Sequence, residues 1–196
     1  MALIGDFGQQ VRKMVELTKL DTEEIIQRVC IMAINNVIRM SPVGNPELWK
    51  VNSDAVAYNR AVSDYNREMR SDPSNLTAAG RLKKGIKEND SMEIKKPKGY
   101  RGGRFRGNWQ VTIGVPSEGE TGIIDPSGAI AKQAANDVIM SFKVGVAKYI
   151  YFCNNVPYAM PLEYGHSTQA PEGMVRITAM QFNQMVSEAA QQVRKK

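Results

Sequence analysis

The sequence predicts an α+β domain in which a long helix from the amino-terminal half and a carboxyl-terminal helix pack with a small, mainly antiparallel sheet. Three observations indicate this fold class. A helical apolar stripe runs over 21–40, β-rich segments lie near 108–115 and 142–154, and a second helical pattern runs over 171–196. The 196 residues, 42% of them apolar, are enough for one ordinary domain with a sizeable core.

The first helix is the clearest element. Its apolar residues recur as adjacent pairs four positions apart, which is typical of an amphipathic helix. The pairs are Ile25 and Ile26, Val29 and Cys30, Ala33 and Ile34, and Val37 and Ile38. Asp21 or Thr22 can cap its start. The prolines of "SPVGNP" cannot continue it, so we expect a helix over 21–40, with a shorter helix over 3–19 leading into it.

A helix-and-loop insertion follows. After the prolines, the sequence predicts a loop, then a weak and largely solvated helix that closes at "SDPSN", and then a long loop or extended arm over 71–107. Residues 81–106 carry ten basic and three acidic side chains, a charge of +7, so the rest of the chain carries −1 of the net charge of +6. We therefore expect a single domain over 1–196 with an inserted, projecting basic arm at about 41–107.

The remaining elements complete the predicted sheet layer. β-branched and aromatic residues with partial alternation predict the two strands near 108–115 and 142–154. Between them, "DPSGAIAKQAANDVIM" favours a short helix opened by Ser127. The final helical pattern over 171–196 ends in "RKK", and basic residues there complement the helix dipole.

The sequence lacks the groups that catalysis or metal binding needs. His166 is the only histidine, and neither a Cys–His nor a Ser–His–Asp framework is recognisable around it. Cys30 and Cys153 have no CxxC partner, so we expect buried free thiols, no metal and no cofactor. A hydrolase using Cys153 is the most distant hypothesis. No signal-peptide pattern or membrane-length apolar run is present, which predicts a reducing cytoplasm.

The segment "KKPKGYRGGRFRGNW" combines cations with aromatic rings. We define the basic arm by Lys95, Lys96, Lys98, Arg101, Arg104, Phe105, Arg106 and Trp109. Such a segment suits nucleic-acid binding, with cations on phosphates and rings stacked on bases. It equally suits docking on another protein, with the arm anchored through Phe105 and Trp109. The residues alone leave both interpretations open, and we favour docking.

The stretch "NNVPYAMPLEYGHSTQAPEGM" predicts a rigid corner that leaves the sheet. Pro157 restricts the backbone, and Gly165 permits a turn with positive φ. We expect Tyr158 and Tyr164 to bury their rings at the corner, and Glu163 to satisfy nearby backbone or basic groups. The predicted assembly motif consists of Pro157, Tyr158, Ala159, Glu163, Tyr164 and Gly165.

The order of "SPVGNPELW", "GGRFRGNWQVTIG" and the corner stretch resembles the neck or tail-completion proteins of long-tailed bacteriophages. Members typically carry a helix ending in a "P-V-D-T-G-x-L-R" segment, then strands, then "Y-A-x-x-x-E-x-G", a proline-rich turn and a final helix. The matching residues are Pro42 and Val43 in the first motif and Tyr158, Ala159, Glu163 and Gly165 in the second. The usual "TGxLRxS" is split by about 50 inserted residues, and the resemblance spans roughly 22–185.

This resemblance implies a structural virion protein without catalysis or cofactor. It would form a homo-oligomeric ring at the head–tail junction, a hexamer being favoured over a dodecamer, and would leave a channel for genomic DNA. Its partners would be the portal-bound connector or stopper and the tail terminator or tail tube, with no membrane. It would assemble in the host bacterial cytoplasm and reside in the virion. The alternative is a nucleic-acid-binding protein that uses the segment 95–109.

Overall fold

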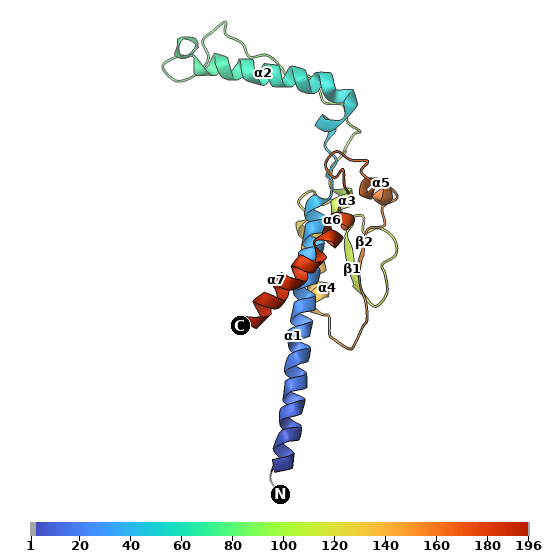
Figure 1. The fold of residues 1–196 in the computed structure, drawn as a ribbon. Helices are drawn as coiled ribbons and strands as arrows, with labels where there is room; N and C mark the ends of the chain where they lie inside the picture. The colour runs from blue at the N-terminus through green and yellow to red at the C-terminus, as the bar shows by residue number, and fades with distance from the viewer. Residues whose placement is uncertain (1–2, 196) are drawn as a thin grey trace. The chain divides into compact units, whose positions relative to one another are not determined.

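The computed structural model describes residues 3–195, with side chains from residue 21 onward and at Met14, Thr18 and Lys19. Its elements are α1 (Leu3–Met40), α2 (Ser53–Ser71), α3 (Arg104–Gly107), β1 (Gln110–Ile113), α4 (Ala129–Met140), β2 (Ile150–Cys153), α5 (Ala159–Glu163), α6 (Val175–Met180) and α7 (Phe182–Arg194) (Figure 1). Short 3-10 helices lie at Pro46–Leu48, Lys50–Asn52 and Pro73–Asn75. The predicted α+β class is confirmed.

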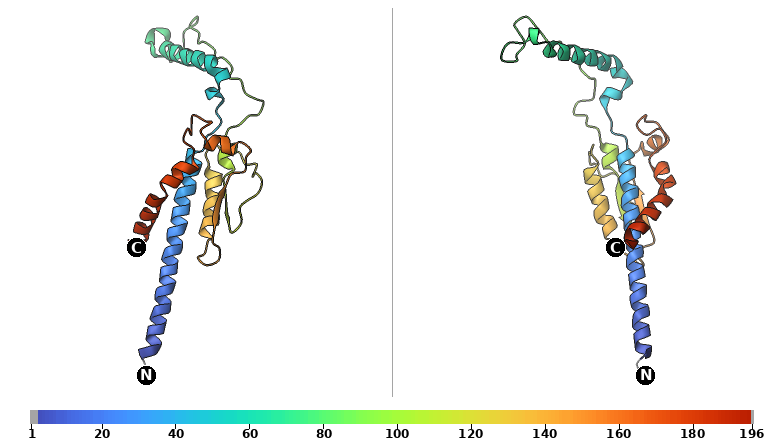
Figure 2. Two further views of the ribbon diagram at one scale, coloured as in Figure 1. Left: turned by 45° about the vertical axis from the view of Figure 1, so that its right-hand side comes forward. Right: turned by 60° about the vertical axis from the view of Figure 1, so that its left-hand side comes forward.

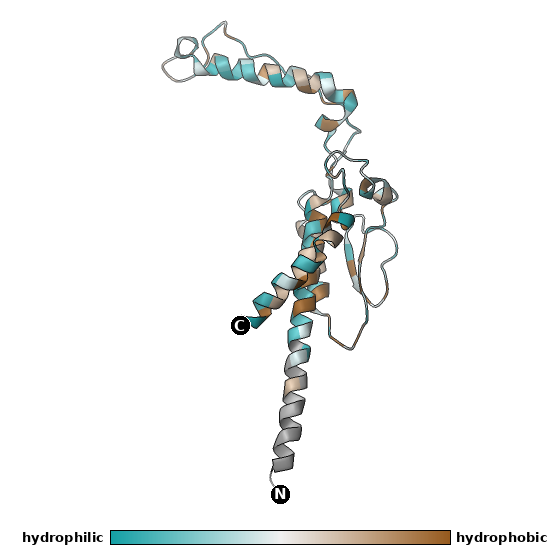
Figure 3. Cartoon of the chain, in the orientation of Figure 1, coloured by the Kyte–Doolittle hydropathy of each residue, from teal (hydrophilic) through white to brown (hydrophobic). Residues whose placement is uncertain are grey.

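The chain divides into two compact units. The first unit comprises Met1–Val43 and Arg101–Lys196, and the second unit comprises Gly44–Tyr100. The sequence placed the insertion at about 41–107, but residues 101–107 belong to the first unit, where α3 packs into the core. Figure 3 shows apolar residues gathered where α1 and α4 meet, whereas α2 of the second unit is mostly hydrophilic.

α1 is one continuous helix, so the predicted break between 3–19 and 21–40 is wrong. Thr22 does not cap a helix start; its hydroxyl donates to the carbonyl of Thr18, one turn earlier, at 2.8 Å. Helix formation continues through this point because the sequence contains no proline or glycine there to stop it. The predicted stop at "SPVGNP" is confirmed, since α1 ends at Met40.

The paired apolar residues of α1 pack on two sides. Val29 and Ala33 join Met185 and Ala189 of α7 in one buried cluster. Ile34 and Ile38 enter a second, larger cluster with residues of α3, α4 and β1. Figure 2 shows α1 between α4 and α7 in both views. Adjacent apolar pairs therefore widen the stripe enough for α1 to be covered from two directions.

β1 and β2 form the antiparallel sheet. Gln110 lies opposite Cys153 at one end, and Ile113 lies opposite Ile150 at the other. Both strands are shorter than predicted, and α4 packs on β1. The sheet is therefore a single antiparallel pair, connected through α4, and its apolar face contacts helices.

The segment 142–149 forms a loop instead of the predicted strand. Glu23 of α1 holds this loop, because its carboxylate accepts from the Lys143 ammonium at 2.8 Å and from the Val144 amide at 3.2 Å. The Gln27 amide donates to the Phe142 carbonyl at 3.1 Å. Polar side chains on α1 thus satisfy backbone groups that a strand would have paired with its neighbour.

α4 begins at Ala129, with Gly128 and not Ser127 at its N-cap position, although the Ser127 hydroxyl accepts from the Ala129 amide at 3.1 Å. The buried Asp125 carboxylate accepts from the amides of Gly128, Ile130 and Ala131 and from the Ser127 hydroxyl. Burial by itself would raise the pKa of Asp125, but the hydrogen bonds from Ser127 and from these three amides outweigh it and lower that pKa. An aspartate outside the predicted helix therefore provides the cap.

The carboxyl-terminal helical pattern is divided into α6 and α7 at Gln181. α6 starts only at Val175, because Gly173 has a φ of 80° and turns the chain just before it. The predicted single helix over 171–196 is therefore wrong at its start and at Gln181. At that break, the side-chain amide of Asn36 on α1 donates to the side-chain oxygen of Gln181 at 3.1 Å.

In the second unit, an extended segment returns along α2 (Figure 1). Three asparagines of the unit, seven residues apart, each form two hydrogen bonds with the backbone N–H and C=O of one residue of this segment. Asn52 pairs with Lys95, Asn59 pairs with Met92, and Asn66 pairs with Asn89, at 2.6 to 2.9 Å. We call this set the asparagine ladder.

The ladder works because two different periods coincide. Seven helical residues advance about 10.5 Å. Three residues of an extended chain of the polyproline II type, which has no internal hydrogen bonds, advance about 9.3 Å. Every third residue of the segment 89–95 therefore meets the next asparagine along α2. The contacts involve the segment's backbone, so no particular side chain is needed at the three paired positions.

Candidate assembly surface

The predicted corner is built around Glu163, the last residue of α5. Its carboxylate accepts from the backbone amides of Met174 at 2.9 Å, Val175 at 3.0 Å and Arg176 at 2.9 Å. These amides open α6 and have no partner within that helix. The prediction that Glu163 satisfies nearby backbone groups is confirmed, and the contact ties α5 to α6.

Two glycines allow this close approach. Gly165 has a φ of 86°, as predicted, and a Cβ atom there would collide with the carbonyl of Pro171. Gly173 also has positive φ, and a Cβ atom there would collide with Glu163. The corner is thus fixed by backbone conformation as well as by the carboxylate.

The two tyrosines are not buried at the corner, so that prediction is wrong. Tyr158 is 37% exposed and Tyr164 is 69% exposed. The core beneath is filled by Val156, Ala170 and Met174, which leaves no room for the rings. The tyrosines instead lie on the surface at the two ends of α5.

Each tyrosine ring lies against an arginine. The Arg104 guanidinium is 5.8 Å from the centre of the Tyr158 ring, and the Arg176 guanidinium is 5.6 Å from the centre of the Tyr164 ring. Arg176 also donates to the Glu163 carbonyl at 3.1 Å. These distances suit cation–π attraction, which holds the rings in place without burying them.

The predicted basic arm is divided between the two units. Lys95, Lys96 and Lys98 lie in the second unit, whereas the arginines from Arg101 onward lie in the first. Arg104 forms a two-nitrogen ion pair with Glu120, with a closest distance of 2.8 Å.

Two of the predicted arm residues, Phe105 and Trp109, are core residues. They are 4% and 7% exposed, and their rings meet edge to face at 5.8 Å. The Trp109 indole donates to the Ser41 hydroxyl at 2.7 Å. The prediction that these rings anchor on a partner is wrong, because their large apolar area is buried within the same chain.

Arg106 also has a structural role. Its guanidinium donates to the carbonyl of Ser41 at 3.1 Å, and to that of Pro126 at 2.8 Å. Partial burial lowers its pKa, and the Asp125 carboxylate opposes that shift. Arg106 thus joins the end of α1 to the turn before α4, whereas Arg101 is exposed.

The second half of the predicted arm meets the corner at Tyr158. The Tyr158 ring lies 6.3 Å from the ring of Phe105, in addition to its contact with Arg104. We define the corner surface as Arg104, Tyr158, Met160, Tyr164 and Arg176, of which Met160 lies one turn before Tyr164. Tyrosine, arginine and methionine are enriched in protein–protein interfaces.

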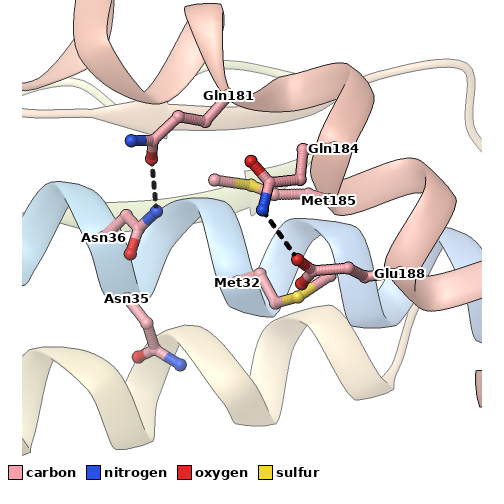
Figure 4. Close-up of a pocket in the computed structure, with 7 residues that line it drawn as sticks. All are labelled: Met32, Asn35, Asn36, Gln181, Gln184, Met185 and Glu188. Carbon is pink, nitrogen blue, oxygen red and sulfur yellow. Dashed lines mark hydrogen bonds between the residues drawn. The ribbon is translucent and has the colours of Figure 1, made fainter.

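A polar groove of about 360 Å³ lies between α1 and α7 (Figure 4). Its lining residues are Met32, Asn35, Asn36, Gln181, Gln184, Met185 and Glu188. Gln184 donates to Glu188 at 2.9 Å, while the side-chain oxygen of Asn35 is buried without a hydrogen-bond partner. Glu188 is the only titratable lining residue, so the groove lacks a pair of groups for acid–base chemistry.

The other groups considered for chemistry are dispersed. His166 is exposed after the corner, and burial raises the pKa of the Cys30 thiol to about 11. Among the side chains that the structure describes, no group of three His, Cys, Asp or Glu residues could hold a metal ion. No helix in that range is long and apolar enough to span a bilayer. Comparison with family models, curated proteins and solved structures found no match to this chain.

The asparagine ladder is the feature that our sequence analysis missed. Asn52, Asn59 and Asn66 stand at heptad spacing in the sequence, and this regularity could have indicated a polar seam on α2. Asn52 is fully buried and also donates to the Pro46 carbonyl at 2.8 Å. The ladder determines which side of α2 the segment 89–95 covers.

Proposed function

We propose that this protein is a structural ring subunit at the head–tail junction of a long-tailed bacteriophage. The observation that carries this proposal is the small core of the second unit. Within residues 44–100, all of which are described, only Asn52, Ala55 and Val62 are buried. A unit of this size gains little stability from so few buried side chains, and contact with neighbouring subunits supplies the missing burial.

The corner surface supports the same proposal. The hydrogen bonds of Glu163 and the close contacts of the two glycines are made within the chain, and they fix the backbone under Tyr158 and Tyr164. Exposed rings held rigidly beside arginines lose little conformational entropy when a partner covers them. The resemblance to neck proteins rests partly on this motif, and a role in subunit contact accounts for why its rings are exposed.

The alternative of nucleic-acid binding through the segment 95–109 loses support. Phe105 and Trp109 cannot stack on bases while they fill the core, and Arg106 is held by backbone carbonyls. The hypothesis of a cysteine hydrolase gains no support, because Cys153 lies on β2 and the described residues show no hydrogen bond between it and His166. The proposed mechanism is therefore geometric: subunits close a ring and position neighbouring virion proteins.

Native mass spectrometry and electron microscopy of the purified protein test this proposal. We expect closed rings, with six copies favoured, and we expect filled heads and separate tails when the gene is deleted from its phage. The Tyr164→Ser variant should keep its melting temperature but join heads to tails poorly. Tyr149→Ser is the matched control, because Tyr149 is also exposed in the first unit but lies outside the corner. A monomer at all concentrations, together with normal virions after deletion, would refute the proposal.

A further inference from the structure

We infer that one face of the second unit binds the opposite face of the second unit in a neighbouring copy of this chain. The contact is heterologous, because it joins two different faces. The inference deepens the proposed ring and rests on it. One face is an acidic, tyrosine-bearing stripe of α2, and the other is the lysine-rich segment on the asparagine ladder. A contact between two different faces can repeat from copy to copy until a ring closes.

The first face lies on the side of α2 away from the ladder. Its residues recur at spacings of three and four positions, with two adjacent pairs among them, so they form one stripe on the helix. We define this acidic face as Asp54, Ala57, Tyr58, Ala61, Asp64, Tyr65 and Glu68, all of which are exposed. Its alanines allow close approach, while its tyrosines offer large amphipathic contacts. Arg60 and Arg67 border the face, and Arg67 pairs with Asp64.

The second face is the segment 81–98. It carries seven cations: Arg81, Lys83, Lys84, Lys87, Lys95, Lys96 and Lys98. Its three carboxylates are those of Glu88, Asp90 and Glu93, and Glu88 is bound by Arg70 of α2. We call it the lysine face. All seven cationic residues are exposed, and Lys83 donates to the Ser74 carbonyl at 2.7 Å.

The asparagine ladder makes the lysine face available. It holds the segment 89–95 through backbone groups, so attachment to α2 does not consume the segment's charged side chains. It also places this segment and the acidic face on opposite sides of one helix. The second unit therefore presents complementary charges in opposite directions, which steers neighbouring copies into the same relative orientation.

The lysine face is also long enough to cover the acidic face. Asp54 and Glu68 are 14 helical positions apart, or about 21 Å. Lys87 and Lys96 are nine positions apart, or about 28 Å in an extended chain. A two-fold contact of the acidic face with itself, centred on Ala61, would instead bring Asp54 of one copy opposite Glu68 of the other. Like charges at that position disfavour the symmetric alternative.

A charge-exchange experiment tests this inference. The acidic-face variant is Asp54→Lys/Glu68→Lys, and the lysine-face variant is Lys87→Glu/Lys96→Glu. None of these four side chains belongs to an ion pair of the described second unit, and Asp54 accepts only a hydrogen bond from the neighbouring Ser53 hydroxyl at 3.3 Å. Both variants should therefore melt like the wild type. Each variant alone should need at least tenfold higher concentration to assemble. An equimolar mixture should recover assembly, because each variant then supplies the charge that the other lacks.

Analytical ultracentrifugation at low and high salt measures the outcome. The matched control, Lys148→Glu/Lys195→Glu, makes the same change in net charge as the lysine-face variant, but at exposed positions of the first unit, and it should assemble normally. Two folded variants that stay unassembled when mixed, or that each assemble alone like the wild type, would overturn the inference. If both variants form rings like the wild type, this inference is refuted but the proposed function is not. Recovered rings that fail to join heads to tails would instead refute that function.

Discussion

The asparagine ladder predicts an unusual pattern of amide hydrogen exchange. In the segment 88–96, the amides of Asn89, Met92 and Lys95 donate to asparagine side chains, and they should exchange more slowly than the amides between them. Protection should therefore repeat every third residue. An ordinary strand pair would protect alternate amides, and an unbound arm would protect none.

Replacing the middle asparagine gives this prediction a magnitude. Asn59→Ala removes two hydrogen bonds to Met92, one at 2.8 Å and one at 2.6 Å. Each such bond contributes a net of about 0.5 to 1.5 kcal/mol, so local opening at Met92 becomes easier by about 1 to 3 kcal/mol. That change accelerates exchange of the Met92 amide by roughly 5- to 150-fold. The amides of Asn89 and Lys95 keep their own hydrogen bonds to asparagine side chains, so their exchange rates should change less.

Residue-resolved exchange by nuclear magnetic resonance measures both effects. Ser63→Ala is the matched control, because Ser63 is exposed on α2 and is not one of the ladder asparagines. The Ser63→Ala variant should leave the exchange rate of the Met92 amide unchanged. Uniform exchange along 88–96 in the wild type would refute the ladder. Unchanged exchange at Met92 in the Asn59→Ala variant would show that this rung contributes nothing to local stability.

Three further predictions concern the first unit. Glu163→Ala removes the acceptor for three amides and should destabilise the fold by about 1 to 2 kcal/mol, lowering the melting temperature by about 2 to 8 °C; a shift no larger than that of Glu172→Ala would contradict it. Because the folded pKa of Asp125 is lowered, its stabilisation is complete above about pH 4 and is lost as pH falls through the folded value. In urea titrations, Asp125→Asn should therefore show a weaker acid dependence than the wild type, and equal dependence would argue against it. Cys30, with its pKa raised to about 11, should react with iodoacetamide on the order of a hundredfold more slowly than a free thiol at pH 8, as measured by mass spectrometry.

Much of the first unit could be predicted from the sequence because local patterns carried the information. The paired apolar residues of α1, the proline stop after Met40 and the positive φ of Gly165 follow from side-chain periodicity and backbone sterics. The role of Glu163 also followed from local chemistry, since a carboxylate at a tight corner needs donors. These features depend on residues close together in the chain.

The exposure of aromatic rings was decided by the tertiary structure. A basic, glycine-rich context gave Phe105 and Trp109 the pattern of an exposed arm, yet both rings fill the core. The corner gave Tyr158 and Tyr164 the pattern of buried anchors, yet Val156 and other small or flexible residues already fill that space. Burial depends on which distant elements pack together, and the residue pattern of a short segment does not determine that packing.

The sequence by itself determined the α+β class, the long apolar stripe of α1, the concentration of positive charge within 81–106 and the backbone turn at the corner. Only the tertiary structure showed that α1 is covered from two sides, that Arg106 belongs to the core framework and that the segment 89–95 returns along α2. The ladder illustrates the physical reason. Asparagines at heptad spacing are visible in the sequence, but their partners are backbone groups, which every residue carries and which only folding selects.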